Sequence, residues 1–251
     1  MSDNLTKLII ESVKDQKEIF GDDLFEQVDF APVNVPVFDE PDFTTTDRVE
    51  LKKTNNYVEE EFQKAESLDE LYKKIHTCVK CPLGHTRTKF VFGVGNPHAD
   101  ALLIGEAPGA DEDKQGEPFV GRAGKLLNDI LKAINFNREE VYIANILKCR
   151  PPGNRDPKPD EIDLCRPYLN KQLELIKPKI ILCLGRIAAN SLLDKKLSLT
   201  MLRENIYEYN GIKVMATYHP AALLRNPGWK RGCWEDVQKF RKLYDELIAD
   251  K

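Results

Sequence analysis

The sequence lacks any long hydrophobic run, since no apolar stretch approaches the roughly 20 residues that span a bilayer. Its first residues, MSDNLTKLIIESVKD, also lack the basic segment and apolar core of a signal peptide. These absences argue against membrane-spanning and secreted proteins and predict a cytoplasmic one. In that compartment six cysteines do not predict a disulfide framework, so metal binding or simple burial is the expectation for them.

The chain also carries little net charge, but its acidic and basic residues are unevenly distributed. Residues 1–66 hold 7 Lys and Arg against 17 Asp and Glu, whereas the remaining residues hold 30 basic against 24 acidic side chains. A basic body is compatible with phosphate contacts, although an ordinary solvated surface of mixed charge explains it equally well.

Residues 1–66 are predicted to form an acidic N-terminal extension that is partly disordered or a linker. Residues 31–46 mix Pro, Asp and Thr without a sustained period. Apolar residues between 5 and 20 fit one face of a short amphipathic helix, which either packs on the body or docks a protein partner.

From residue 67 onward, strand-like and helix-like patterns alternate. A capping-box pattern at Ser67 and Glu70 predicts a helix through about His76. Four short β-rich runs follow at 101–104, 141–147, 180–184 and 214–217, separated by helical patterns that include 124–134, 160–176 and 234–248. This alternation predicts an α/β fold with a mainly parallel central sheet and helices on both faces, whose ligand lies beyond the carboxyl ends of the strands.

Four of the cysteines have a spacing that suggests a metal centre. Cys78 and Cys81 form a C-x2-C pair, and Cys149 and Cys165 follow as widely spaced single residues. Four thiolates suit a [4Fe–4S] cluster or a structural zinc, but zinc ribbons usually repeat the close pair. The alternative is that Cys149 and Cys165 are small buried hydrophobes. Cys183, inside an apolar run, is predicted to be a core residue.

Five sequence features occur together in a familiar order: GEAPG at 105–109, GEPFVGRAG at 116–124, NILKCRPP at 145–152, HPAALLR at 219–225, and the four cysteines. In this combination the chain resembles the family-4 uracil-DNA glycosylases over about residues 67–250. The resemblance implies a three-layer α/β/α catalytic domain over residues 67–251, with a [4Fe–4S] cluster on Cys78, Cys81, Cys149 and Cys165. It also implies a monofunctional enzyme that hydrolyses uracil from DNA and leaves an abasic site.

The resemblance also assigns the residues that bind the base. Phe119 is expected to stack on uracil, and Asn145 to read its edge, because an amide offers both a donor and an acceptor. His219 is expected to donate a hydrogen bond to uracil O2 as negative charge develops there. Taken one at a time, these three are equally compatible with a core Phe, a strand-end Asn and a structural His.

Further roles follow from the same resemblance. Glu106 is the candidate for orienting or activating water, or else a carboxylate that satisfies loop N–H groups. Glu112 is expected to crowd the base's C5 position, and Gly105 and Ala107 to complete the base-binding wall. Leu223, Leu224 and Arg225 resemble a loop that fills the gap left by a flipped base. Candidate phosphate contacts are Lys148, Arg150, Arg155, Arg186 and Arg225.

The sequence departs from two neighbouring branches of this superfamily. GEAPG carries a carboxylate where family 5 has a non-polar residue, and no basic insertion with its own histidine lies between 185 and 214. Hydrolysis with turnover is therefore expected, on single- or double-stranded uracil-containing DNA, by a nucleoid-associated monomer. Two alternatives stay open, namely a catalytically silent DNA-binding iron–sulfur member of the fold and an iron–sulfur electron carrier.

Overall fold

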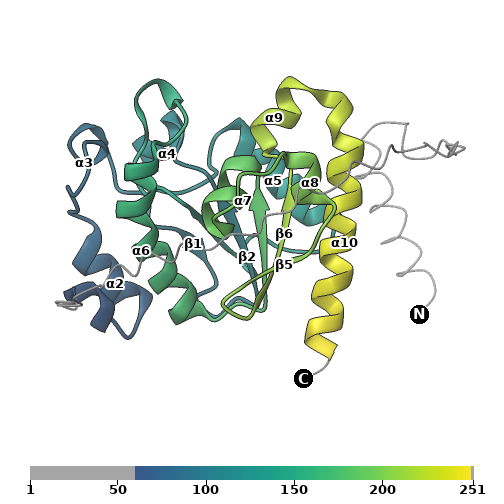
Figure 1. The fold of residues 1–251 in the computed structure, drawn as a ribbon, viewed down its shortest axis with the longest axis horizontal. Helices are drawn as coiled ribbons and strands as arrows, with labels where there is room; N and C mark the ends of the chain where they lie inside the picture. The colour runs from purple at the N-terminus through teal and green to yellow at the C-terminus, as the bar shows by residue number, and fades with distance from the viewer. Residues whose placement is uncertain (1–59, 250–251) are drawn as a thin grey trace, which may run out of the picture.

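The computed structural model describes residues 60–249, which fold around one six-stranded sheet (Figure 1). The strands are β1 (Val94–Gly95), β2 (Ala101–Gly105), β3 (Tyr142–Asn145), β4 (Ile180–Leu184), β5 (Tyr207–Tyr209) and β6 (Ile212–Thr217). Their order across the sheet is β1-β3-β2-β4-β6-β5, in which β3, β2, β4 and β6 are parallel and the two edge strands are antiparallel. The four predicted runs are thus the parallel centre of the sheet.

The α-helices connect these strands and close the molecule. They are α2 (Leu68–Ile75), α3 (Leu83–Thr86), α4 (Ala110–Gln115), α5 (Arg122–Ala133), α6 (Pro159–Ile176), α7 (Arg186–Leu193), α8 (Leu199–Arg203), α9 (Pro220–Arg225) and α10 (Lys230–Ala249). Three short 3-10 turns are added, η2 (Glu61–Lys64), η3 (Pro152–Asn154) and η4 (Pro227–Trp229). None of the helices within residues 60–249 is both long and apolar enough to cross a membrane.

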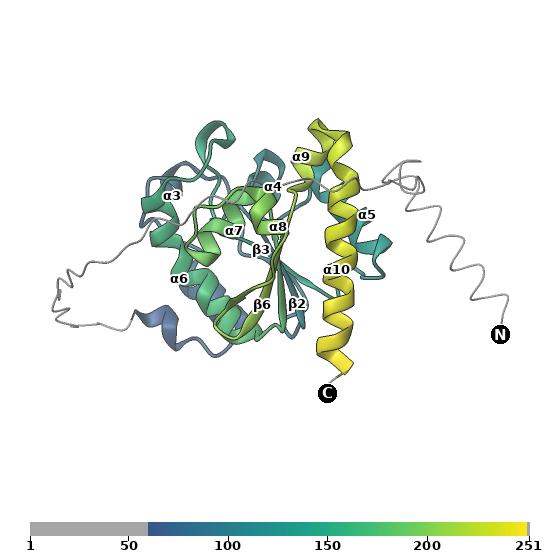
Figure 2. The same cartoon turned by 45° about the vertical axis from the view of Figure 1, so that its right-hand side comes forward.

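The sheet is buried on both faces, as a parallel sheet requires. Alternate residues of its central strands enter two different core clusters, one shared with α2, α6 and α7 and the other with α5 and α10. Figure 2 shows these two groups of helices on opposite sides of the sheet. The predicted α/β fold with three layers is confirmed.

The N-terminal part of the described chain packs against this body. The Ser67 hydroxyl accepts a hydrogen bond from Glu70 N and caps α2, as the capping-box pattern predicts. Phe62 is buried and meets the Tyr168 ring edge-on at 4.8 Å between centroids, so packed structure includes residues of the predicted extension. The helix predicted between residues 5 and 20 and the linker at 31–46 lie outside the described residues.

Candidate active site

A cavity of about 350 Å³ lies at the carboxyl ends of the parallel strands. The segments that follow β2, β3 and β6 line it, together with the loop between α4 and α5, and α4 and α9 gather at this end in Figure 1. The sequence-predicted residues that it brings together are Glu106, Ala107, Glu112, Phe119, Asn145, Arg155, His219 and Arg225. The expectation that the ligand site lies beyond the strand ends agrees with this cavity.

Asn145 ends β3 and brings a polar side chain into a buried position. It is 3% exposed, and its Oδ1 atom accepts no hydrogen bond within the described part of the chain. Leaving a buried acceptor unsatisfied costs about 1–3 kcal/mol. An orphaned amide oxygen in the wall of a cavity is therefore placed to meet a donor on a ligand.

Two glycines let Phe119 reach the same cavity. A Cβ at Gly105 would lie 2.3 Å from Asn145 Oδ1 and 2.7 Å from Phe119 Cε2, so any side chain there would displace both. A Cβ at Gly124 would lie 1.9 Å from the Phe119 carbonyl oxygen. Phe119 itself has a φ of 54°, a left-handed backbone conformation that a bulky residue adopts only when its surroundings hold it there.

His219 faces Phe119 from the start of α9, with 5.5 Å between ring centroids. Its Nδ1 atom accepts a hydrogen bond of 3.1 Å from Ala221 N, which caps the helix and leaves the ring proton on Nε2. Burial, followed by the charge of Arg225, lowers the pKa of His219 to about 4. At neutral pH the ring is therefore an uncharged donor with a fixed tautomer.

Glu106 follows β2, and its carboxyl group lines this cavity. Burial is the main cause and the charge of Asp156 adds to it, while Arg186 opposes both, and together they raise the pKa of Glu106 to about 7. Such a carboxyl accepts a proton readily near neutral pH, which suits a general base.

Glu112 lines the cavity, where it was expected to crowd the C5 position of a base, and it also makes hydrogen bonds that the sequence did not suggest. Its two carboxylate oxygens accept backbone hydrogen bonds from Gly109 N at 3.1 Å, Val120 N at 3.0 Å and Gly121 N at 3.1 Å. The side chain lines the cavity, but its hydrogen bonds tie the loop that carries Phe119 to the start of α4.

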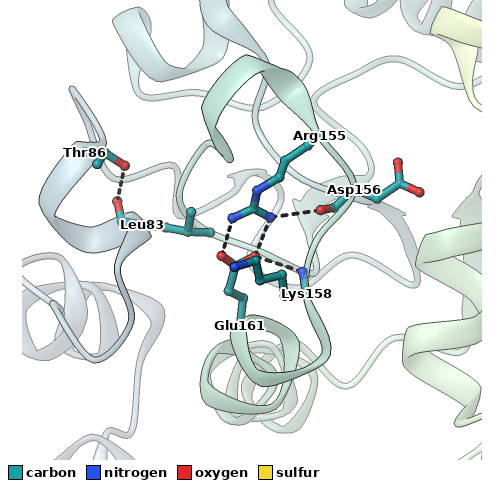
Figure 3. Close-up of polar contacts among 6 residues, drawn as sticks. All are labelled: Leu83, Thr86, Arg155, Asp156, Lys158 and Glu161. Carbon is teal, nitrogen blue, oxygen red and sulfur yellow. Dashed lines mark hydrogen bonds and ion pairs between the residues drawn. The ribbon is translucent and has the colours of Figure 1, made fainter.

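Arg155, which lines the cavity, forms an ion pair that the sequence did not predict (Figure 3). Arg155, a candidate phosphate contact, grips the buried Glu161 carboxylate through both terminal nitrogens, at 2.9 and 2.5 Å. Arg155 also donates to the backbone oxygen of Asp156 at 2.9 Å, and the Asp156 carboxylate points away from this ion pair. Asp156 lines the cavity and raises the pKa of Glu106, a role that no sequence signal reveals.

Two further assignments disagree with the observed burial. Lys148, expected to contact phosphate, is fully buried and so lies out of reach of a DNA backbone. Leu223, expected to wedge between bases, is also fully buried and packs in the core cluster of α5 and α10, because the short helix α9 turns this side inward. Leu224 and Arg225 are exposed and form the outer surface of this segment.

The four predicted cluster cysteines lie in one region, where their charges act on one another. Burial raises the pKa of Cys149 to about 11 and that of Cys165 to about 12. Between residues 60 and 249, no three His, Cys, Asp or Glu side chains are arranged to hold a single metal ion. Cys183 and Cys233 lie elsewhere, fully buried in β4 and α10, which confirms the core assignment of Cys183.

Hydrogen-bond donors and cations surround these thiols. Tyr168 donates its hydroxyl to Cys78 Sγ at 3.1 Å, Arg87 Nη1 lies 3.4 Å from Cys149 Sγ, and the backbone N of Lys148 lies 3.4 Å from Cys165 Sγ. The Lys148 ammonium donates to Asn145 O at 2.9 Å and to Gln172 Oε1 at 2.6 Å, and no described carboxylate lies within 4 Å of it. A buried ammonium that pairs with no carboxylate of residues 60–249 would be stabilised by a negative charge in this region.

Comparison with known proteins agrees with this arrangement. The family model of the uracil DNA glycosylase superfamily matches residues 92–247. A type-4 uracil-DNA glycosylase of Archaeoglobus fulgidus is 47% identical over 186 residues, which cover 71% of this chain and 94% of that protein. One of Thermotoga maritima is 42% identical over 72% of this chain and 96% of the relative, and one of Sulfurisphaera tokodaii is 44% identical over 71% and 85%. The chain therefore belongs to the type-4 branch of the uracil-DNA glycosylase superfamily.

Proposed function

We propose that this chain is a monofunctional DNA glycosylase that hydrolyses the N-glycosidic bond of uracil in DNA and leaves an abasic site. The observation that carries the proposal is the orphaned Asn145 Oδ1, buried in a cavity whose other walls are the Phe119 ring and the neutral His219 ring. DNA is the substrate of the superfamily to which the chain belongs.

The pocket recognises the base through the polarity of Asn145. The Asn145 Oδ1 atom would accept from uracil N3–H, and its Nδ2 group would donate to uracil O4. Cytosine presents the opposite polarity at this edge, an acceptor at N3 and a donor at N4, so it would leave both groups of the buried amide unsatisfied. Phe119 would stack on the flipped base, and Gly105 and Ala107 would form the wall beside it.

The reaction needs a stabilised leaving group and a water nucleophile. As the C1′–N1 bond breaks, its electron pair moves onto the uracil ring, and His219 Nε2–H would donate to O2, where negative charge develops. Water would attack C1′ to form the new C–O bond, and its proton would pass to the Glu106 carboxylate. The charge of Glu106 would also favour the cationic sugar that forms between these events.

Residues around the pocket would hold the reacting groups and the DNA. Glu112 keeps the Phe119 loop against the base through its three backbone contacts, so its exclusion of a C5 methyl group would depend on that loop. Leu224 and Arg225, exposed at the end of α9, would enter the space left by the flipped nucleotide and contact phosphate.

Cys78, Cys81, Cys149 and Cys165 would hold a [4Fe–4S] cluster. A cubane cluster distributes four thiolates over four iron atoms, so its ligands need not converge on one ion. The cations Arg87 and Lys148 and the donor Tyr168 fit the net negative charge of such a cluster with four thiolate ligands. When bound, the cluster would join the start of the domain to the loop after β3 and to α6.

The proposal also covers the setting in which the chain acts. Residues 67–251 would form the catalytic domain, working as a monomer on nucleoid DNA in the cytoplasm. Residues 1–66 would recruit a protein partner, which the apolar face predicted between residues 5 and 20 supports.

The test is excision from an oligonucleotide with one U·G pair, in the presence of EDTA, followed by alkaline cleavage of the abasic site. Matched T·G and C·G duplexes test base selection. Asn145→Ala should abolish most of the activity, whereas Asn128→Ala, which removes an exposed amide bonded to Arg138, should leave it unchanged. No excision by protein that carries its full complement of iron would contradict the proposal and favour a catalytically silent DNA-binding protein.

A further inference from the structure

Trp229 is a large aromatic side chain that the protein leaves exposed beside the active site. The sequence contains two tryptophans, and Trp234 is buried in the core while Trp229 is 45% exposed. Trp229 lies in η4, between the end of α9 and the start of α10. Covering exposed indole surface is stabilising, so a ligand that packed on Trp229 would gain binding free energy.

One face of the Trp229 ring is supported by Tyr218. The two rings are stacked, with 5.4 Å between centroids and 25° between planes. Tyr218 directly precedes His219, so this aromatic pair is joined by a peptide bond to the ring that faces the base cavity.

A buried ionic network fixes Tyr218 in turn. Arg203 donates to the Tyr218 hydroxyl at 2.8 Å, and its guanidinium lies 4.3 Å from the centre of the ring. Arg203 also binds both carboxylate oxygens of Asp236, which is 2% exposed and accepts a further hydrogen bond from Thr217 at 2.7 Å. Strand β6, helix α8 and helix α10 therefore hold the pair in one orientation before any ligand arrives.

The charge around Trp229 fits a nucleic acid. Residues 217–234 contain three basic residues and no acidic one, namely Arg225, Lys230 and Arg231, of which Arg231 pairs with the neighbouring Glu235 at 3.6 Å. Positive charge next to an exposed, supported aromatic ring is the combination with which proteins hold single-stranded nucleic acid. A base in an intact duplex is already stacked on both sides, so it offers no free face to the indole.

We propose that Trp229 is a stacking platform for an unpaired base next to the uracil that is bound in the cavity. The aromatic pair of Trp229 and Tyr218 extends the binding site beyond the flipped nucleotide and favours single-stranded DNA over duplex. The proposal rests on DNA binding by the proposed function, but it concerns a residue that need not touch the reacting nucleotide.

The test uses the full chain carrying its iron and a single-stranded oligothymidylate without uracil, which binds but is not cleaved. Indole fluorescence should be quenched as this probe is added, and the quenching should disappear in Trp229→Ala, in which the buried Trp234 remains as the only indole. The dissociation constant should rise roughly 5- to 150-fold in Trp229→Ala, the range for loss of one base–aromatic stack. Trp229→Phe should retain most of the affinity.

A matched control is Tyr72→Ala, which removes another exposed aromatic ring that is stacked on a neighbour, His76, far along the sequence from this site. It should bind the probe as the unaltered chain does. Unchanged affinity in Trp229→Ala, or an equal loss for a duplex probe of the same length, would overturn the proposal. Uracil excision by the unaltered chain is measured in parallel, and its absence would count against the proposed function alone, because quenching reports binding without chemistry.

Discussion

Asn145 and Lys148 are separated by two residues, yet Asn145 lies in an uncharged wall of the cavity and Lys148 lies in a region with two cationic side chains. The cavity at Asn145 offers a neutral imidazole, an aromatic ring and an unsatisfied amide oxygen, which suits a neutral, polar base. The region at Lys148 offers a buried ammonium, the Arg87 guanidinium and four thiols, which suits an anionic group. One short segment, which begins with the last residue of β3, therefore contributes to both regions.

Removing the hydrogen-bond donor from the neutral cavity tests this contrast most directly. His219→Ala should lower the single-turnover rate of uracil excision by about 10²–10³, the cost of losing one donor to a developing anion. The matched control is His98→Ala, which removes an exposed imidazole outside the cavity and should leave the rate unchanged.

A loss of the helix cap accompanies the loss of the donor in His219→Ala. The cap accounts for about 1 kcal/mol of the free energy of unfolding, so denaturant titration separates this effect from the effect on rate. A rate within threefold of the unaltered chain would show that the cavity does not use His219 as an electrophile.

The second prediction tests the cationic region. Lys148→Met should lower the free energy of unfolding of the iron-loaded protein by about 3 kcal/mol, because an anionic cluster would lose its buried counter-charge. Denaturant titration and iron content measure this. The control is Lys171→Met, a nearly buried lysine that is paired with Glu174 at 2.7 Å and lies on the same helix as Cys165. If both variants lose equal stability, Lys148 has no special relation to the four cysteines.

The third prediction concerns Gly105, whose missing side chain leaves room for Asn145 and Phe119. Gly105→Ala should reduce excision by about 10²-fold, because its Cβ would lie 2.3 Å from Asn145 Oδ1 and would shift the amide that is proposed to bind the base. Gly228→Ala is the control, since a Cβ there meets nothing within 4 Å. Competition by free uracil would show whether the loss arises in base binding, and an unchanged inhibition constant would contradict this explanation.

The sequence alone predicted the parallel centre of the sheet, and most residues that the family resemblance assigned to the base line one cavity. Its apolar runs were short and well separated, and parallel topology brings the ends of such strands to one edge. Strands β1 and β5 were not predicted, because β1 has two residues and β5 is a half-exposed edge strand with a polar centre. Helix α4 was also missed, because its residues ADEDKQ show no apolar period and its ends are fixed by Gly109 and Gly116.

The direction in which individual side chains point could not be predicted from the sequence. A lysine beside a cluster motif suggests a phosphate contact, but the packing of β3 against α6 turns Lys148 inward, onto Gln172. In the six-residue helix α9 the contact with α5 decides that Leu223 is buried while Leu224 is exposed. The influence of Asp156 on the pKa of Glu106 likewise depends on the fold, because the two residues are 50 positions apart in the sequence.

The pH dependence of excision should report the pKa of Glu106, and mutations near Glu106 should shift it only slightly. A base must be deprotonated to accept a proton, so excision should rise with pH through about 7, the pKa to which burial, Asp156 and Arg186 together bring Glu106. Asp156→Asn removes a negative charge that opposes ionisation, so the midpoint should move to lower pH. Arg186→Gln removes a positive charge that favours ionisation, so the midpoint should move to higher pH. Each shift should be less than about one pH unit, since burial is the larger cause and stays in place. Rate profiles of single-turnover excision between pH 5 and 9 measure both, and movement of the two midpoints in the same direction would show that Glu106 is not the group whose ionisation limits the reaction.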